Sequence, residues 1–446
     1  MTAINISIQL DSSRNLHGPL LFLNDNGVAG KVVVYSCDSA QFDSVRIILE
    51  GTIRSSLISA AIWSSAQGSR MEMKQKLIHM QTSLQKRNHQ PDDQGTVRFP
   101  FHFTIPSHIL IPKSGGASST DMVHPLPPSL LVDVDSRSLT TPSISTAQSS
   151  QRADCRIAYT LHAYLMRNGS TTTGTFRHVM LFPTQEPQPP SCTSDFPGDY
   201  ALSRSAVLRT AMLFRRLGQL SVETMEPAPL EMSRKKNGAS TAIHLVLRFR
   251  ESRERSKCES MSPPTPDFGA VSLKLKQMTF ISVEPQRRLP ATRDLLTSPL
   301  MAKDTEIIYE QLRKLKFSPW VRSRWKEEDG GISDQERRVW ETKATLIFTY
   351  ANGKRPAPTF SSALVSRRYS VRIAFRLERV YHGTLELEVP LQIIYRGDGQ
   401  IPLSDESELG DSELASSDET LTLRSESQST AVTLAAENEQ APDYVP

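Results

Sequence analysis

Apolar and polar residues alternate along several stretches of this chain, with the two-residue period of a half-buried β-strand. The clearest stretch is FPFHFTIP at 99–106, where three phenylalanines and an isoleucine alternate with Pro100, His102 and Thr104. A second stretch, IAYTLHA at 157–163, repeats the pattern. Proline ends the first stretch and stands again in the loop before the second, as is typical of connections between strands. This period predicts sheets and not helices, because an amphipathic helix needs apolar residues three and four positions apart.

The same period predicts strands throughout both halves of the chain. The candidates in the first half are 4–10, 29–35, 44–53 and 176–182, and those in the second are 220–225, 242–249, 271–283 and a hairpin within 358–395. Two long regions, 54–96 and 284–345, have no hydrophobic period that decides between helix and strand. We therefore expect an all-β protein with two regions left unassigned.

Length and charge indicate two domains and a tail. A chain of 446 residues exceeds what one hydrophobic core usually serves, and the prolines of 183–197 indicate a linker between two such cores. Residues 401–446 contain 11 acidic residues and one arginine, whereas residues 1–400 contain 51 basic and 37 acidic residues, a net charge of +14. A basic body favours anionic partners, and an acidic, polar end predicts a disordered tail.

Several of these segments, in their order along the chain, resemble parts of an arrestin. FPFHFTIP, LPPSL at 126–130, DCRIAYTLHAYL at 154–165 and the strand ending in LEG at 49–51 are similar to the N-terminal half of that family. YSVRIAF at 369–375 and the hairpin after it resemble the end of the arrestin C-terminal domain. The LPPS loop and the YSVRIAF strand are most similar to fungal α-arrestin-like proteins. The resemblance covers about 4–183 and 215–396.

The arrestin resemblance implies two immunoglobulin-like β-sandwich domains placed end to end, with a disordered acidic C-terminal tail. The domain boundaries that we expect are 1–183 for the N-terminal sandwich, 184–205 for the linker, 206–398 for the C-terminal sandwich and 399–446 for the tail.

The resemblance also implies a function. It predicts a non-enzymatic adaptor that binds cytosolic segments of membrane proteins and links them to a HECT-type ubiquitin ligase and the endocytic machinery. Such an adaptor would be cytoplasmic and peripheral at the plasma membrane or endosomes. The alternative is an arrestin-like structural scaffold of endosomal trafficking that recruits no ligase.

Motifs of catalysis and cofactor binding are missing from the sequence. It contains no GxSxG elbow, no phosphate-binding loop, no GxGxxG and no HExxH, so we expect neither an enzyme nor a cofactor. His102 and His108 flank a strand end without further metal ligands in the pattern.

The four cysteines are far apart and include no CxxC pair, which predicts free thiols in a reducing compartment. The basic groups at 215–216 and 234–236 have no aromatic residues interleaved with them, so no nucleic-acid partner is expected.

Two short peptides are candidate partner sites. Pro442 and Tyr444 in APDYVP match part of the PPxY or LPxY peptides that WW domains of ubiquitin ligases bind, with Ala441 in place of the leading residue. The alternative is an unstructured terminus. The second peptide is LVDVD, which fits a clathrin box through Leu131, Val132, Val134 and Asp135, and the alternative is an ordinary strand.

Basic groups near the start of the second half are candidates for contact with anionic lipid surfaces. The alternative for each group is a solvated loop. The residues are Arg215, Arg216, Arg234, Lys235 and Lys236.

Overall fold

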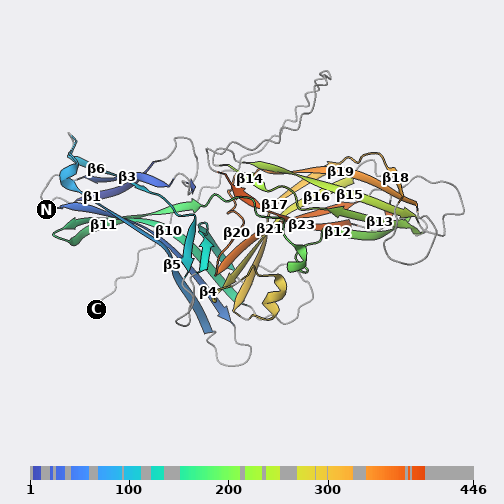
Figure 1. Ribbon diagram of the computed structural model, residues 1–446, viewed down its shortest axis with the longest axis horizontal. Coiled ribbons are helices and arrows are strands. Elements are labelled where there is room, and N and C mark those ends of the chain that lie inside the picture. Colours follow the sequence, from blue (N-terminus) through green and yellow to red (C-terminus); the bar gives the residue numbers. More distant parts are fainter. Residues whose placement is uncertain are drawn as a thin grey trace, which may run out of the picture. The chain divides into compact units, whose positions relative to one another are not determined.

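The computed structural model describes most of the first 396 residues. The described ranges are 4–11, 21–23, 27–35, 42–59, 69–92, 95–111, 122–134, 151–210, 216–233, 238–251, 269–286, 288–298, 300–324, 338–376, 380–381 and 384–396. These ranges contain β-strands and short 3₁₀ turns but no α-helix (Figure 1). Residues 1–400 belong to one compact unit. The protein is therefore all-β, as the period-two pattern predicts.

Strands of the first half form two main sheets and a small one. The three-stranded sheet has the order β1-β3-β6, and the six-stranded sheet has the order β2-β11-β10-β4-β5, with β9 also paired to β10. All pairs are antiparallel except β2 with β11, and β7 and β8 form a separate hairpin. The bounds are β1 Asn5–Leu10, β2 Leu21–Leu23, β3 Val28–Tyr35, β4 Ser44–Ser59, β5 Ser69–Gln85, β6 Thr96–Phe103, β7 His108–Ile111, β8 Met122–Pro125, β9 Leu130–Val134, β10 Gln151–Arg167 and β11 Ser170–Phe182.

Strands of the second half form two further large sheets. One has the order β18-β19-β15-β13-β12-β22, and the other has the order β17-β16-β21-β20 with β23 paired to β21. A parallel pair, β14 with β24, lies apart from them in the pairing. The bounds are β12 Ser203–Thr210, β13 Arg216–Thr224, β14 Leu230–Met232, β15 Ala239–Glu251, β16 Gly269–Ser282, β17 Met301–Leu315, β18 Val321–Arg324, β19 Arg338–Tyr350, β20 Phe360–Ser361, β21 Val365–Arg376, β22 Val380–Tyr381, β23 Thr384–Leu391 and β24 Ile393–Tyr395.

Alternation along the strands decides which side chains enter the core. Phe99, Phe101 and Phe103 on β6 are buried, and the residues between them are exposed. On β21, Val371, Ile373 and Phe375 are buried and Arg372 is exposed, whereas residues 365–370 are buried on both faces of the strand. The strands predicted at 99–106, at 157–163 and in the late hairpin are confirmed, although β6 already ends at Phe103.

Buried tyrosines hold proline-containing loops against the strands. The hydroxyl of Tyr159 donates to the carbonyl of Pro127 at 2.6 Å, and that of Tyr395 donates to the carbonyl of Pro356 at 2.8 Å. Burial raises the pKa of both hydroxyls, because water no longer stabilises the phenolate. The LPPSL and AYTL segments are therefore in direct contact.

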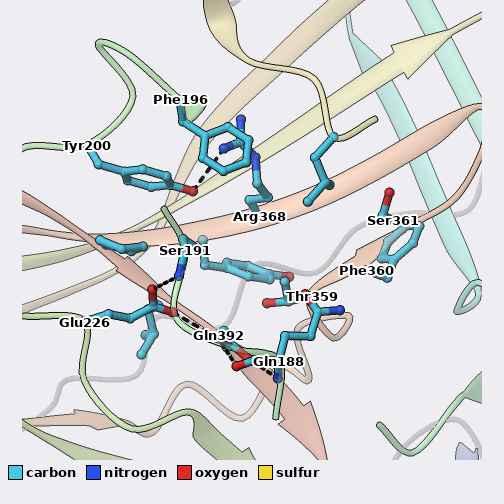
Figure 2. Close-up of a pocket in the computed structure, with 14 residues that line it drawn as sticks. Gln188, Ser191, Phe196, Tyr200, Glu226, Thr359, Phe360, Ser361, Arg368 and Gln392 are labelled. Carbon is cyan, nitrogen blue, oxygen red and sulfur yellow. Dashed lines mark hydrogen bonds between the residues drawn. The ribbon is translucent and has the colours of Figure 1, made fainter. Parts of the chain in front are cut away.

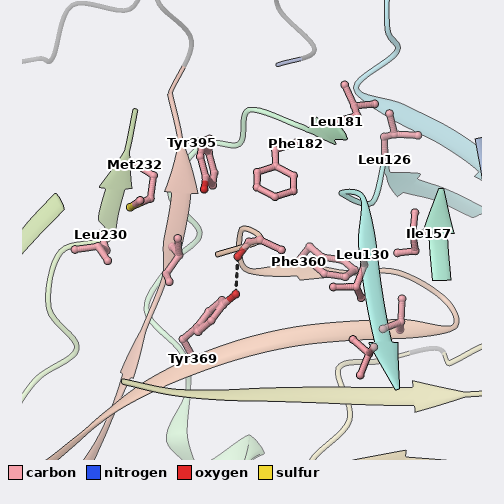
Figure 3. Close-up of a cluster of buried hydrophobic side chains, with 14 of the residues drawn as sticks. Leu126, Leu130, Ile157, Leu181, Phe182, Leu230, Met232, Phe360, Tyr369 and Tyr395 are labelled. Atoms are coloured by element: carbon pink, nitrogen blue, oxygen red, sulfur yellow. Dashed lines mark hydrogen bonds between the residues drawn. The ribbon is translucent and has the colours of Figure 1, made fainter. Parts of the chain in front are cut away.

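The buried apolar side chains of the two halves form one continuous cluster. Figure 3 shows the side chains of Phe182, at the end of β11, and Tyr395, on β24, close to each other, and their ring centroids are 5.0 Å apart. The hydroxyl of Ser55 on β4 donates to the carbonyl of Ser282 on β16 at 2.7 Å in a buried position. The domain boundaries at 183, 205 and 398 stay predictions.

The two insertions that the sequence leaves unassigned contain strands. The first holds β5, and the second holds β17, β18 and the start of β19. On β5 the half-buried positions are occupied by a mixture of methionine, glutamine, threonine and leucine, which weakens the hydropathy alternation. Pairing with β4, more than the local pattern, makes this segment a strand.

Candidate functional site

The most elaborate polar site in the described part of the chain surrounds Arg368. It includes residues from the segment between β11 and β12, residues 183–202, which we name the linker segment. Arg368 lies on β21, and its side chain is 6% exposed. Its guanidinium donates to Asp199 Oδ2 at 3.0 Å, to the carbonyl of Pro290 at 2.8 Å and to the hydroxyl of Tyr200 at 3.1 Å. Asp199 and Tyr200 both belong to the linker segment, so one arginine connects that segment to the sheet.

Aromatic rings enclose the same guanidinium. Its central carbon lies 4.1 Å from the ring centroid of Phe196 and 4.9 Å from that of Phe280. Figure 2 shows Phe196 and Tyr200 beside Arg368. Cation–π attraction is strongest when the cation is desolvated, as it is here. The linker segment thus supplies a carboxylate, a hydroxyl and a ring to a single cation.

Asp199 has further partners in Thr292 and Lys303. The backbone N–H of Thr292 donates to Asp199 Oδ2 at 3.1 Å, its hydroxyl donates to Oδ1, and Lys303 Nζ lies 3.7 Å from Oδ1. Burial by itself would raise the pKa of Asp199, but the hydrogen bonds from Thr292 and the charge of Lys303 outweigh it, so this pKa lies below its usual value. The carboxylate is therefore ionised at neutral pH.

Lys303 has the opposite balance. Burial lowers its pKa to about 8, and the neighbouring carboxylate of Asp199 only partly offsets that effect. Its ammonium donates to the hydroxyl of Thr292 at 2.6 Å. The site therefore holds two cations around one carboxylate, and Arg368 Nε is buried without a hydrogen-bond partner.

A small cavity of about 40 Å³ lies between the linker segment and the sheet (Figure 2). Beside it, Gln392 exchanges hydrogen bonds with the backbone of Gln188, at 2.9 Å in both directions, and also donates to Glu226. Glu226 in turn accepts from the N–H of Ser191 at 2.6 Å. A cavity of this size holds water and is far below the roughly 300 Å³ of a typical small-molecule site. The arrangement fastens the linker segment at two points, one around Gln392 and one around Arg368.

Several of the site residues predicted from the sequence lie outside the described residues. These are Pro442, Tyr444, Asp135, Arg215, Arg234, Lys235 and Lys236. Arg216 is the first residue of β13. The WW-peptide and lipid-contact hypotheses stay predictions.

The clathrin-box candidate coincides with β9, which pairs with β10. Leu131 is 77% exposed and Val132 is buried, so neighbouring side chains alternate as in an ordinary strand. That strand is the alternative reading of LVDVD, and clathrin binding stays a prediction.

The residues of the Arg368 site are not among those predicted from the sequence. The only local signals are the adjacent arginines Arg367 and Arg368, which point to opposite faces of one strand, and the DFPGDY sequence at 195–200 of the linker segment. Neither has a spacing that indicates an ion pair across 169 residues. Comparisons with known proteins add no further signal, since neither a family model nor a curated protein matches this chain.

Three other observations concern the described residues. Cys155 and Cys192 are free thiols, as predicted, while Cys37 and Cys258 lie outside the described ranges. No group of three or more potential metal ligands occurs within those ranges. Among the same residues, none forms a helix of the length and hydropathy needed to span a bilayer.

Proposed function

We propose that this chain is an arrestin-like adaptor of the α-arrestin type, built from two immunoglobulin-like sandwiches at 1–183 and 206–398, a linker at 184–205 and a disordered acidic tail at 399–446. The observation that carries the proposal is the hydrogen bond from Tyr159 to Pro127, because it joins two segments on which the resemblance rests. The late hairpin of β21 and β23, a third such segment, is also present.

The proposed mechanism is tethering. Cytosolic segments of a membrane protein bind to the sheets of the body, and Pro442 with Tyr444 binds the WW domain of a HECT-type ubiquitin ligase. The linker segment is fastened by Arg368 and Gln392, which supports a body of defined geometry between the two partners. Clathrin and anionic lipids are further proposed partners, and the site of action is the cytoplasmic face of the plasma membrane or endosomes.

The test uses purified WW domains of a HECT-type ligase and the full-length protein in a calorimetric titration. We expect binding by wild type and a loss of at least tenfold in affinity for Tyr444→Ala, since the tyrosine ring fills the aromatic groove of a WW domain. Tyr35→Ala, which removes an exposed tyrosine from β3, serves as the matched control and should bind like wild type. Equal affinity of wild type and Tyr444→Ala would overturn ligase recruitment and favour the scaffold alternative.

A further inference from the structure

Strand β5 has one edge without a partner strand among the described residues. It is the last strand in the order β2-β11-β10-β4-β5 and pairs only with β4, over 17 residues. On β4 the inward side chains such as Leu49 and Ile53 are buried, whereas the inward side chains of β5, such as Met73 and Met80, are only half-buried. Among the described residues no strand pairs with the second flank of β5, so its backbone N–H and C=O groups are available for pairing there.

A β-bulge interrupts β5 at the middle of this edge. Ile78 is opposite Gly51 and Lys76 is opposite Thr52, so Leu77 is the extra residue. Gly51 accommodates the bulge, because a Cβ there would lie 2.8 Å from Ile78 and 2.6 Å from the Tyr159 ring. Bulges bend an edge and redirect side chains, and they are common beside binding sites.

An apolar groove of about 540 Å³ lies along the edge at the bulge. Leu77, Ile78 and Met80 line it from β5, Ile105 lines it from the segment between β6 and β7, and Ile109 and Leu110 line it from β7. Leu110 is 64% exposed although it is a large apolar residue. An unpaired strand edge beside an apolar groove is the arrangement that binds extended peptides, where the backbone pairs with the edge and alternate side chains enter the groove.

Charge on the solvent-facing side of β5 selects among occupants. Arg70, Lys74 and Lys76 are exposed there, and the single acidic residue between them, Glu72, is paired with Arg54 at 2.7 Å. Lys76 Nζ lies 3.6 Å from Glu50 on β4, so Lys74 is the cation of this face that has no ion pair among the described residues. Pairing with the same edge of a second copy would place basic residues near basic residues, which is unfavourable across strands. An incoming strand with acidic residues at alternate positions would complement this face.

We propose that the β5 edge and its groove bind an extended segment of a partner protein in which apolar residues alternate with acidic ones. The segment adds a strand to β5, buries its apolar side chains against Leu77, Met80 and Leu110, and places its carboxylates beside Lys74 and Lys76. The inference deepens the proposed function, and it rests on that function only for the identity of the segment as part of a membrane protein.

The test measures binding of a fluorescein-labelled peptide by anisotropy with the full-length protein. The probe is an eight-residue peptide of alternating glutamate and leucine or valine, and the comparison peptide has the same composition with its acidic and apolar residues grouped separately. We expect the alternating peptide to bind at least tenfold more tightly. Binding should also weaken as salt rises, because the lysine contacts lie at the surface.

Variants of the protein locate the site. Leu110→Asp should weaken binding of the alternating peptide at least tenfold. The peptide would bury the exposed Leu110 side chain, and burial of a leucine contributes at least that factor to affinity. Leu312→Asp is the matched control, because Leu312 is a 75% exposed leucine on β17 outside the groove, and it should change affinity less than twofold. Lys74→Glu should weaken binding at low salt, and hydrogen exchange should show new protection of β5 amides in the complex.

Several outcomes would overturn the proposal. They are absence of binding at millimolar peptide, equal affinity for both peptides, equal effects of Leu110→Asp and Leu312→Asp, or protection that maps elsewhere. A dimer in sedimentation that Leu110→Asp abolishes would show that a second copy occupies the edge. None of these results depends on Tyr444, so a failure here is distinguishable from a failure of the WW-domain test.

Discussion

At the residue scale, burial distinguishes the two free cysteines in the described part of the chain. Cys155 on β10 is fully buried, and this desolvation raises the pKa of its thiol to about 12. Cys192, in the linker segment, is exposed. Because the thiolate is the reactive form, two free cysteines of one chain differ in reactivity through their positions.

Alkylation with iodoacetamide at pH 8 should therefore modify Cys192 and leave Cys155 protected in the folded protein. Peptide mapping by mass spectrometry measures both sites in the same sample. Addition of denaturant provides the control, since Cys155 should then react like Cys192. Rapid modification of Cys155 without denaturant would contradict its burial.

Lys303 should make stability depend on pH. Its pKa is about 8 in the folded protein and about 10.5 when unfolded, so the unfolded state binds more protons between these values and stability rises with pH across that window. The free energy of unfolding of wild type, measured against Lys303→Met by urea denaturation, should rise by about 2 kcal/mol from pH 8 to pH 10. Lys314→Met is the control, because it removes an exposed lysine from the same strand and its difference from wild type should not change with pH in this way. A flat difference would show that Lys303 is not desolvated.

At the scale of elements, the linker segment is irregular in backbone but tightly fastened. It contains no strand, as its prolines predict, yet Phe196 and Asp199 are buried against the β21 sheet. Asp199 neutralises the buried Arg368 and the largely buried Lys303. Removing one member of a buried ion pair is costly because it leaves the other charge uncompensated.

Asp199→Asn should therefore destabilise the protein by about 3–5 kcal/mol and speed proteolytic cleavage within the linker segment. Glu386→Gln is the matched control, since Glu386 pairs with Arg372 in an exposed position and should contribute at most about 1 kcal/mol. Urea denaturation gives the free energies, and limited proteolysis reports the linker. Similar losses for the two variants would be evidence against a structural role of the buried pair.

At the scale of the whole molecule, the two sets of sheets share one apolar cluster. Phe182 ends the last strand of the first set and packs edge-on against Tyr395 from the second, so burial in one half depends on the other. Shared burial of this kind couples the unfolding of both halves.

Calorimetry should consequently show one unfolding transition for the β-sheet body. Phe182→Ala should lower the midpoint by several degrees, because loss of a buried phenylalanine costs about 3–5 kcal/mol. Phe176→Ala on the same strand is the control, since Phe176 is 63% exposed and should change the midpoint little. Two well-separated transitions in wild type would show that the halves unfold independently.

The amino-acid sequence by itself determined the fold class, most of the strands and the residues that face the core. Alternation is a local property, so Phe99, Phe101 and Phe103, or Tyr369 and Ile373, reveal their strands without knowledge of the partner strands. The same locality explains why the sequence pattern does not predict the strands β5 and β17. Most of their side chains are half-buried or exposed because both strands lie at sheet edges, where hydrophobic alternation is weak.

Only the tertiary structure decided the sites. The pair of Asp199 with Arg368, the contact of Phe182 with Tyr395 and the groove between β5 and β7 each join residues distant in the chain. No local pattern encodes such a contact, because its energy comes from desolvation and packing after the sheets have formed. The sequence specifies which side chains are buried, whereas the assembled sheets determine which of them meet.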